Sequence, residues 1–208
     1  MHKFLGHLKT VIVHKWWVFF YCCKFGIPFR GIIHDLSKFR PVEFFESVKY
    51  YSGTRSPIDA CKELNGVSKA WMSHKGRNKH HYEYWQDNFD AGTSHIVMPF
   101  KYSLEMLCDY LGAGRAYSKK SFTYKGELEW FKNKLKTANA MHPVQKAFIY
   151  ELLKCLANND SFPYILKINK DSLHSWAKYK YDTVYNLWIQ NPKKIRDLYP
   201  YIESEDNQ

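Results

Sequence analysis

The stretch His34-Asp35-Leu36-Ser37-Lys38-Phe39 decides how the rest of the chain is interpreted. A histidine is followed directly by an aspartate, and a lysine stands three residues beyond the aspartate. Neighbouring side chains on a helical turn point about 100° apart, so a metal ion at this corner can take an imidazole nitrogen and a carboxylate oxygen. Two ligands make a poor site, and the chain offers more candidates: His14, His74, His80, His81 and Asp109.

The composition indicates a folded protein that does not cross a membrane. The 208 residues are 45% hydrophobic and 18% aromatic, which suffices for a core of one domain, or of one domain with an appended piece. The longest apolar stretch, 16–23, is too short to span a bilayer, and the first residues lack the apolar region of a signal peptide. Five cysteines without a CxxC pair indicate reduced thiols. We therefore expect a cytoplasmic protein.

The chain is basic, with 31 Lys and Arg against 20 Asp and Glu and a net charge of +11. Such a charge attracts phosphates on nucleotides, nucleic acids or membranes. The basic residues are spread along the sequence and are equally compatible with an ordinary solvated surface. The charge by itself therefore identifies no partner.

Apolar spacing predicts a helix over 3–25, ended by Gly26 and Pro28, with a short loop at 26–31 leading to the His-Asp corner. In this helix His7, Val11, His14 and Val18 share one stripe, which places His14 toward the core.

Further helices are predicted, and together they indicate an all-α fold. Their ranges are 41–51, 57–75, 99–111 (ended by Gly112-Ala113-Gly114), 125–137, 143–157 and 172–190, the last capped by Asp171 or Ser172. The best strand candidate, 162–168, is weak, and 203–208 is expected to fray. We expect a helical metal-binding domain over 1–157 and a helical extension of unknown role over 158–208. Trp16-Trp17 and Phe44-Phe45 are expected in the core.

The candidate ligands suit divalent Mn, Fe, Zn, Co or Ni, one ion or two. Two ions about 3.5–4 Å apart can hold both the attacking and the leaving oxygen of a phosphate ester. The first ion is expected on His14, His34, Asp35 and Asp109. The second is expected on a bridging Asp35 with His74 and either His80 or His81. Lys38 would hold a phosphate oxygen as a point charge.

This ordered set, His14, then His34-Asp35 with Lys38, then Asp109, resembles the HD-domain superfamily of metal-dependent phosphohydrolases, which are helical bundles. More narrowly, the sequence resembles the uncharacterised bacterial and phage family DUF5662, itself HD-like, over about residues 5–157. The segments that carry this resemblance are 34–39 with Glu43, 78–85, Met98-Pro99 and 105–109. The resemblance implies a phosphomonoesterase or phosphodiesterase that acts on a small, nucleotide-like substrate through a metal-activated water.

Two other functions remain open. HD-like proteins include di-iron oxygenases, which the sequence does not separate from hydrolases. The segment Arg77-Asn78-Lys79 beside His80-His81 can be a basic, aromatic surface for nucleic acid or protein, or equally the phosphate-binding wall of an active site. In the same way, Glu43 and Glu105 either orient metal-binding histidines or are an ordinary helix-start acid and a surface acid.

Overall fold

All regular secondary structure in the part of the chain that the structure describes is helical. The computed structural model describes residues 1–87, 95–160 and 163–199, and in these ranges it contains ten α-helices and no strand. The closest approach to a sheet in these ranges is an isolated bridge between Gln86 and His95. The predicted all-α class is therefore confirmed. Among the described helices, none combines the length and the apolar character that a bilayer crossing requires.

Proline begins half of these helices. It suits the first helical position because its φ angle is already helical and its missing N–H is not needed there. The helices are α1 (His2–Lys24), α2 (Pro28–Ile33), α3 (Pro41–Tyr50), α4 (Pro57–Asn65), α5 (Lys69–Lys75), α6 (Phe100–Ser118), α7 (Tyr124–Leu135), α8 (Pro143–Ala157), α9 (Lys170–Gln190) and α10 (Pro192–Leu198). Short 3-10 helices cover Leu36–Phe39, Tyr82–Tyr84, Lys119–Ser121 and Tyr164–Lys167.

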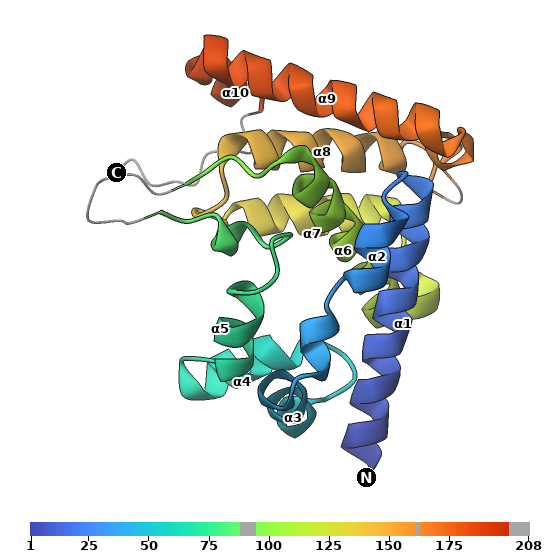
Figure 1. Cartoon of the computed structure of the whole chain (residues 1–208), viewed down its shortest axis with the longest axis vertical. Coiled ribbons are helices and arrows are strands. Elements are labelled where there is room, and N and C mark those ends of the chain that lie inside the picture. The colour runs from blue at the N-terminus through green and yellow to red at the C-terminus, as the bar shows by residue number, and fades with distance from the viewer. Residues whose placement is uncertain (88–94, 161–162, 200–208) are drawn as a thin grey trace.

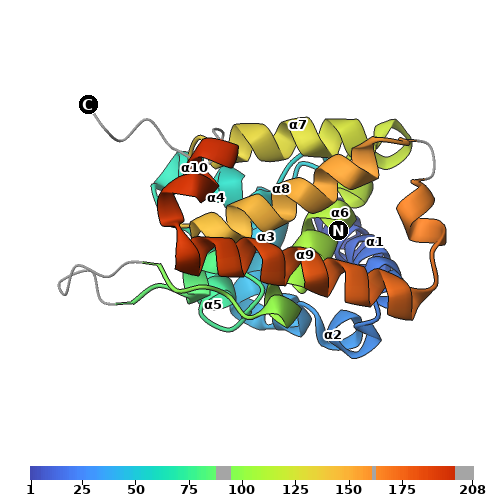
Figure 2. The same ribbon diagram turned by 90° about the horizontal axis from the view of Figure 1, so that it is seen from above.

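The helices form two groups along α1. Figure 1 shows α3, α4 and α5 beside the N-terminal half of α1, whereas α7, α8 and α9 are stacked at its other end. Seen from above, α8 lies alongside α9 (Figure 2). The main core fills the second group and includes Val18, Leu107, Phe148 and Val184, from α1, α6, α8 and α9 respectively. The division after residue 157 stays a prediction, and α9 shares its core with the helices that precede that division.

Two helical boundaries differ from those predicted because of local turn chemistry. The segment expected as a loop, 26–31, contains most of α2, since Pro28 occupies the first turn of a new helix as well as following the old one. The single helix expected over 57–75 is two helices. Gly66 ends α4 with a φ of 73°, and the Ser68 side chain caps α5 by accepting a hydrogen bond from the N–H of Trp71.

The predicted end of the fourth helix at Gly112 is wrong, because α6 continues to Ser118. The glycine is needed for helix packing and not for termination. A Cβ atom added at Gly112 would lie 2.4 Å from Cγ2 of Val18 and 3.0 Å from its backbone nitrogen. Helices α1 and α6 therefore approach each other more closely here than any larger residue permits.

Other local predictions also need correction. The described part of the strand candidate 162–168 contains a 3-10 helix at Tyr164–Lys167. Helix α9 begins at Lys170, and the Asn169 side chain caps it in place of Asp171 or Ser172. Trp16 and Phe45 are 62% and 61% exposed, so the core prediction fails for them, although it holds for Phe44. The expectation for 203–208 lies outside the described residues.

We predict that Gly112→Ala destabilises the protein by about 1–3 kcal/mol, the usual cost of overpacking a tight contact. Gly76→Ala is the matched control, because Gly76 has a helical φ of −73° and its added Cβ would meet only the carbonyl oxygen of Met72 at 3.4 Å. Urea unfolding measures both. Equal stability of the two variants would contradict the close approach of α1 and α6.

His142 makes the stability of this fold depend on pH. Its Nδ1 accepts a hydrogen bond from the N–H of Val144 at 3.1 Å at the start of α8. Burial, with a smaller effect of His95, lowers the pKa of His142 from 6.5 to about 4. The unfolded chain thus binds a proton that the folded chain does not, and stability is lost as the pH falls from about 6.5 toward 4.

We predict that His142→Asn, which keeps a capping acceptor, removes on the order of 3 kcal/mol of this acid-induced loss. Urea unfolding of both proteins at neutral pH and near the acid end of that window measures the difference. The effects of the other titrating groups are common to the two proteins and cancel. An identical loss in wild type and variant would show that His142 does not cause it.

Candidate metal centre

The His-Asp pair lies at a sharp turn between two helices. His34 is the residue after α2, with a φ of −52° and a ψ of 130°. Asp35 follows with a φ of 52°, in the left-handed region, before the 3-10 helix that contains Lys38. The helical turn assumed from the sequence is therefore wrong. Left-handed geometry is uncommon for residues other than glycine, is tolerated best by Asn and Asp, and is concentrated at functional sites. Here the turn directs both side chains into the interior, where each is 1% exposed.

Other elements bring the remaining candidates to Asp35. His14 lies on the buried stripe of α1, as predicted, and His74 lies in the last turn of α5. His80 and His81 follow in the turn after α5. Asp109 lies on α6, one turn beyond Glu105 and on the same face. The structure thus brings together all seven residues that the sequence proposed as metal ligands.

These residues form two adjacent groups with Asp35 in both. In each group the potential ligand atoms lie within 4.8 Å of one another: His14, His34, Asp35 and Asp109 in the first, and Asp35, His74, His80 and His81 in the second. The two oxygens of Asp35 face different groups. Oδ2 lies 3.2 Å from Nε2 of His34, whereas Oδ1 lies 3.3 Å from Nε2 of both His74 and His80. This is the placement that a bridging carboxylate requires.

Carboxylates outside these groups hold the histidine rings in position. Oε1 of Glu105 lies 3.1 Å from Nδ1 of His34 and 3.4 Å from Nδ1 of His80. Oε2 of Glu43 likewise accepts from Nδ1 of His74 at 2.8 Å. Each of the three rings therefore turns its Nε2 toward Asp35. A carboxylate on the far nitrogen is the usual support of a metal-binding histidine, and Glu105 is fully buried, which rules out its interpretation as a surface acid.

Two of these supporting interactions escaped the sequence analysis. Arg30 donates to Oε2 of Glu105 from its Nε at 2.7 Å and its Nη2 at 2.6 Å, which fixes the carboxylate that holds two histidines. Ser37 donates to Glu43 at 2.8 Å. Recognising Pro28 as the start of a helix would have placed Arg30 one turn before His34. For Ser37 the sequence carries no comparable signal.

The charges of the cluster are strongly coupled. Burial alone would raise the pKa of Asp35, but His34 and Lys38 hold it well below the ordinary range, and Nζ of Lys38 lies 2.6 Å from Oδ2. Burial would also raise the pKa of Glu105, yet hydrogen bonds from His34 and His80 keep it at about 2. The pKa of His81 is lowered by burial and by its neighbour His80. The cluster therefore contains ionised carboxylates and an imidazole, that of His81, whose neutral form is favoured, and both are forms that bind metal ions. The neighbouring carboxylates raise the pKa values of His34 and His74 against the effect of burial, so a metal ion would displace protons from these two rings.

The residues present fit divalent metal ions. Oδ1 of Asp35, Nε2 of His80 and Nε2 of His81 are buried, and none has a hydrogen-bond partner of acceptable geometry in the described structure. Buried polar atoms are normally paired, so unpaired atoms that converge on one point need an explanation. Imidazole nitrogens with carboxylate oxygens are the donor set of Zn, Fe, Mn, Co and Ni sites. His80 and His81 both qualify as ligands of the second group.

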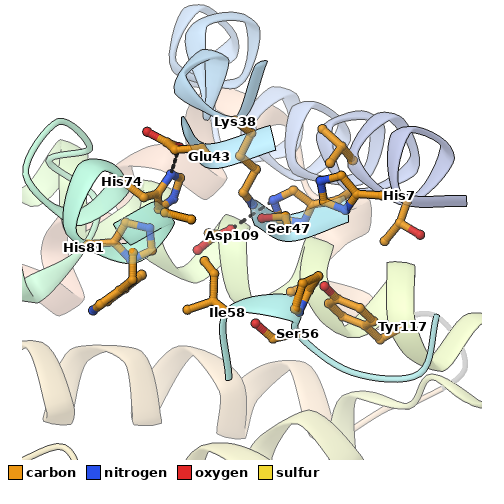
Figure 3. Close-up of a pocket in the computed structure, with 17 residues that line it drawn as sticks. His7, Lys38, Glu43, Ser47, Ser56, Ile58, His74, His81, Asp109 and Tyr117 are labelled. Atoms are coloured by element: carbon orange, nitrogen blue, oxygen red, sulfur yellow. Dashed lines mark hydrogen bonds and ion pairs between the residues drawn. The ribbon is translucent and has the colours of Figure 1, made fainter. Parts of the chain in front are cut away.

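The groups open onto a cavity of about 200 Å³ between α1, α5 and α6. Figure 3 shows His74 and His81 on one side of it, Lys38 and Asp109 near its middle, and His7 on the opposite side. Apart from these residues, its lining is mainly apolar or uncharged, with Val11, Ile58 and Tyr117 among the members. A substrate in this cavity would contact both groups and the ammonium of Lys38.

Arg77 and Asn78 do not line that cavity. They lie at a second depression on the other side of His34 and Asp35. The amide of Asn78 donates to Oγ of Ser37 at 2.8 Å, and Arg77 donates to the carbonyl of Ser73 at 3.1 Å. His80 is 1% exposed and is therefore no part of a basic surface. The substrate-binding role predicted for Arg77 and Asn78 stays a prediction, at a position apart from the cavity.

Comparison with known proteins places this site within one family. No curated protein and no solved structure matches the chain. A family of unknown function, DUF5662, matches residues 3–155, a segment that contains every candidate ligand and ends within α8. The chain therefore belongs to the family DUF5662, as its motifs indicated.

Proposed function

We propose that this protein is a metal-dependent phosphohydrolase, a phosphomonoesterase or phosphodiesterase, with two metal ions on either side of Asp35. The observation that carries the proposal is the division of the Asp35 carboxylate between two buried groups of ligands. The order of the ligands along the chain supports the further proposal that the family is HD-like. Two divalent ions bound at such a site would polarise the oxygens of a phosphate ester and lower the pKa of a bound water molecule.

The residues around the cavity would serve this chemistry in distinct ways. Lys38 points into the cavity from beside Asp35 and is held by the 2.6 Å ion pair. Although burial alone would lower the pKa of Lys38, the charges of Asp35 and Asp109 raise it, so the ammonium keeps its proton at any physiological pH. It would bind a phosphate oxygen and stabilise the charge that develops in the transition state. The apolar walls would limit the number of water molecules that compete with the substrate for these charged groups.

We predict that Asp35→Asn abolishes metal binding at both groups, since Asp35 belongs to each, and that Asp109→Asn loses only the first. Elemental analysis of protein purified without added metal measures the content. Asp182→Asn, on the exposed surface of α9, is the matched control. Unchanged metal in the Asp35→Asn protein would contradict the bridged site.

The identity of the bound metal separates the open alternatives. Iron with an absorbance change in air would favour the oxygenase. Absence of metal from wild type, even after reloading, would favour a non-catalytic binding protein.

We predict that Lys38→Met lowers kcat/KM for a phosphate ester by about 100- to 1,000-fold, the usual cost of removing one charge-stabilising group, while the metal content stays the same. Released inorganic phosphate is the readout, with Lys9→Met on the exposed face of α1 as control. Activity equal to wild type in Lys38→Met would remove this lysine from the mechanism. A wild-type protein that holds metal but releases no phosphate from any ester would refute the hydrolase.

A further inference from the structure

His7 is a buried histidine of the cavity with unsatisfied ring nitrogens. The residue is 6% exposed, and neither Nδ1 nor Nε2 has a hydrogen-bond partner in the described ranges. It lines the same cavity as the metal-ligand groups but belongs to neither of them. A neutral imidazole offers one donor and one acceptor, and buried groups of this kind are normally paired. The ring therefore has no hydrogen-bond partner among the described residues, and a bound ligand could supply one.

The surrounding residues hold this ring in place. Its centroid lies 5.1 Å from that of Phe44 and 5.8 Å from that of Tyr51. Tyr51 is itself fixed, because its hydroxyl shares a 2.9 Å hydrogen bond with Oγ1 of Thr10. Gly6 gives the tyrosine ring room, since a Cβ at that position would lie 2.6 Å from Cε1 of Tyr51. His7 is thus fixed in position at the cavity wall.

Helix α1 sets the separation between His7 and the metal centre. His7 and His14 lie on the same buried stripe, seven residues apart, which corresponds to about 10 Å along the helix axis. In Figure 3 Lys38 and Asp109 lie between His7 and the histidines His74 and His81. The cavity therefore has two chemically different ends, one with charged groups and one with an unpaired imidazole.

The end at His7 suits an uncharged polar group. Burial and, to a smaller extent, the charge of Lys38 lower the pKa of His7 to about 4, so the ring is neutral at physiological pH. Beside it the lining includes the hydroxyl side chains of Thr10 and Ser47 and the apolar Val11. A second phosphate at this end would meet no cation among these neighbours. A hydroxyl, in contrast, can either donate to the ring or accept from it.

We propose that His7 recognises the uncharged, hydroxyl-bearing end of a compact phosphomonoester whose phosphate lies at Lys38 and the metal centre. The phosphate end of this assignment rests on the proposed function, whereas the hydroxyl end rests on His7 alone. The inference narrows the substrate to the monophosphate of a small hydroxylated alcohol. Nucleoside polyphosphates are excluded by it, because they would place charge at the neutral end.

A series of ω-hydroxyalkyl phosphates of increasing chain length tests this proposal, each compared with the plain alkyl phosphate of the same length. Calorimetric titration of the metal-loaded protein with the matching phosphonates, in which a C–P bond that resists hydrolysis replaces the ester bond, gives the two affinities. We expect the hydroxyl to improve affinity roughly tenfold at the chain length that spans the cavity, the worth of one good hydrogen bond. His7→Phe should abolish this gain and leave the affinity for plain alkyl phosphates unchanged, and His7→Gln should restore part of it.

A wild-type protein that shows no hydroxyl-dependent gain at any length would overturn the proposal, as would a His7→Phe protein that keeps the gain. If His7→Phe does not fold, ¹⁵N resonances of the His7 ring in wild type replace it. They should shift with the hydroxylated ligand and not with its plain counterpart. Phosphate release is followed separately. A hydroxyl-dependent gain without hydrolysis would refute the hydrolase alone, and hydrolysis without such a gain would refute the role of His7 alone.

Discussion

The charge of one buried carboxylate is the constraint on which the rest of the structure depends. Asp35 is almost fully buried, and an isolated charge there would be very unfavourable. Imidazoles from separate elements and the ammonium of Lys38 surround it instead. To bring these groups together, α2 must end at His34 and the chain must adopt a left-handed turn at Asp35. The arrangement of α1, α5 and α6 around that turn follows from the same requirement.

Satisfaction of hydrogen bonds differs between the outside and the inside of the cluster. The outer nitrogens of His34, His74 and His80 contact carboxylates, and Arg30 anchors one of these carboxylates in turn. On the inner side, Nε2 of His80 and Nε2 of His81 have no hydrogen-bond partner in the described structure. In a cluster that served only to stabilise the fold, we would expect hydrogen bonds on both sides of each ring, because an unpaired buried polar group destabilises the folded state. The asymmetry is what a preorganised metal site requires.

Residue types and their order sufficed to identify the candidate ligands, because imidazole and carboxylate chemistry depends on those types alone. The stripe on α1 also placed His14 correctly, since helical periodicity is a local property. Gly112 was misinterpreted because its role depends on Val18 of another helix, which no local pattern reveals. Arg30 was missed because a proline that ends one helix also begins the next. The exposure of Trp16 shows that aromatic character does not by itself indicate burial.

The face of α6 that supplies Glu105 and Asp109 continues to Gly112, where α1 lies too close for any larger residue. One face of one helix is thus constrained in two ways: Glu105 and Asp109 by their contacts with the histidines of the cluster, and Gly112 by the packing of α1. Replacement of the two acids would not relax the constraint at Gly112, because Val18 leaves no room there for a Cβ atom. A protein with this glycine but without the two acids would therefore keep the packing of α1 against α6 and lack the carboxylates of the cluster.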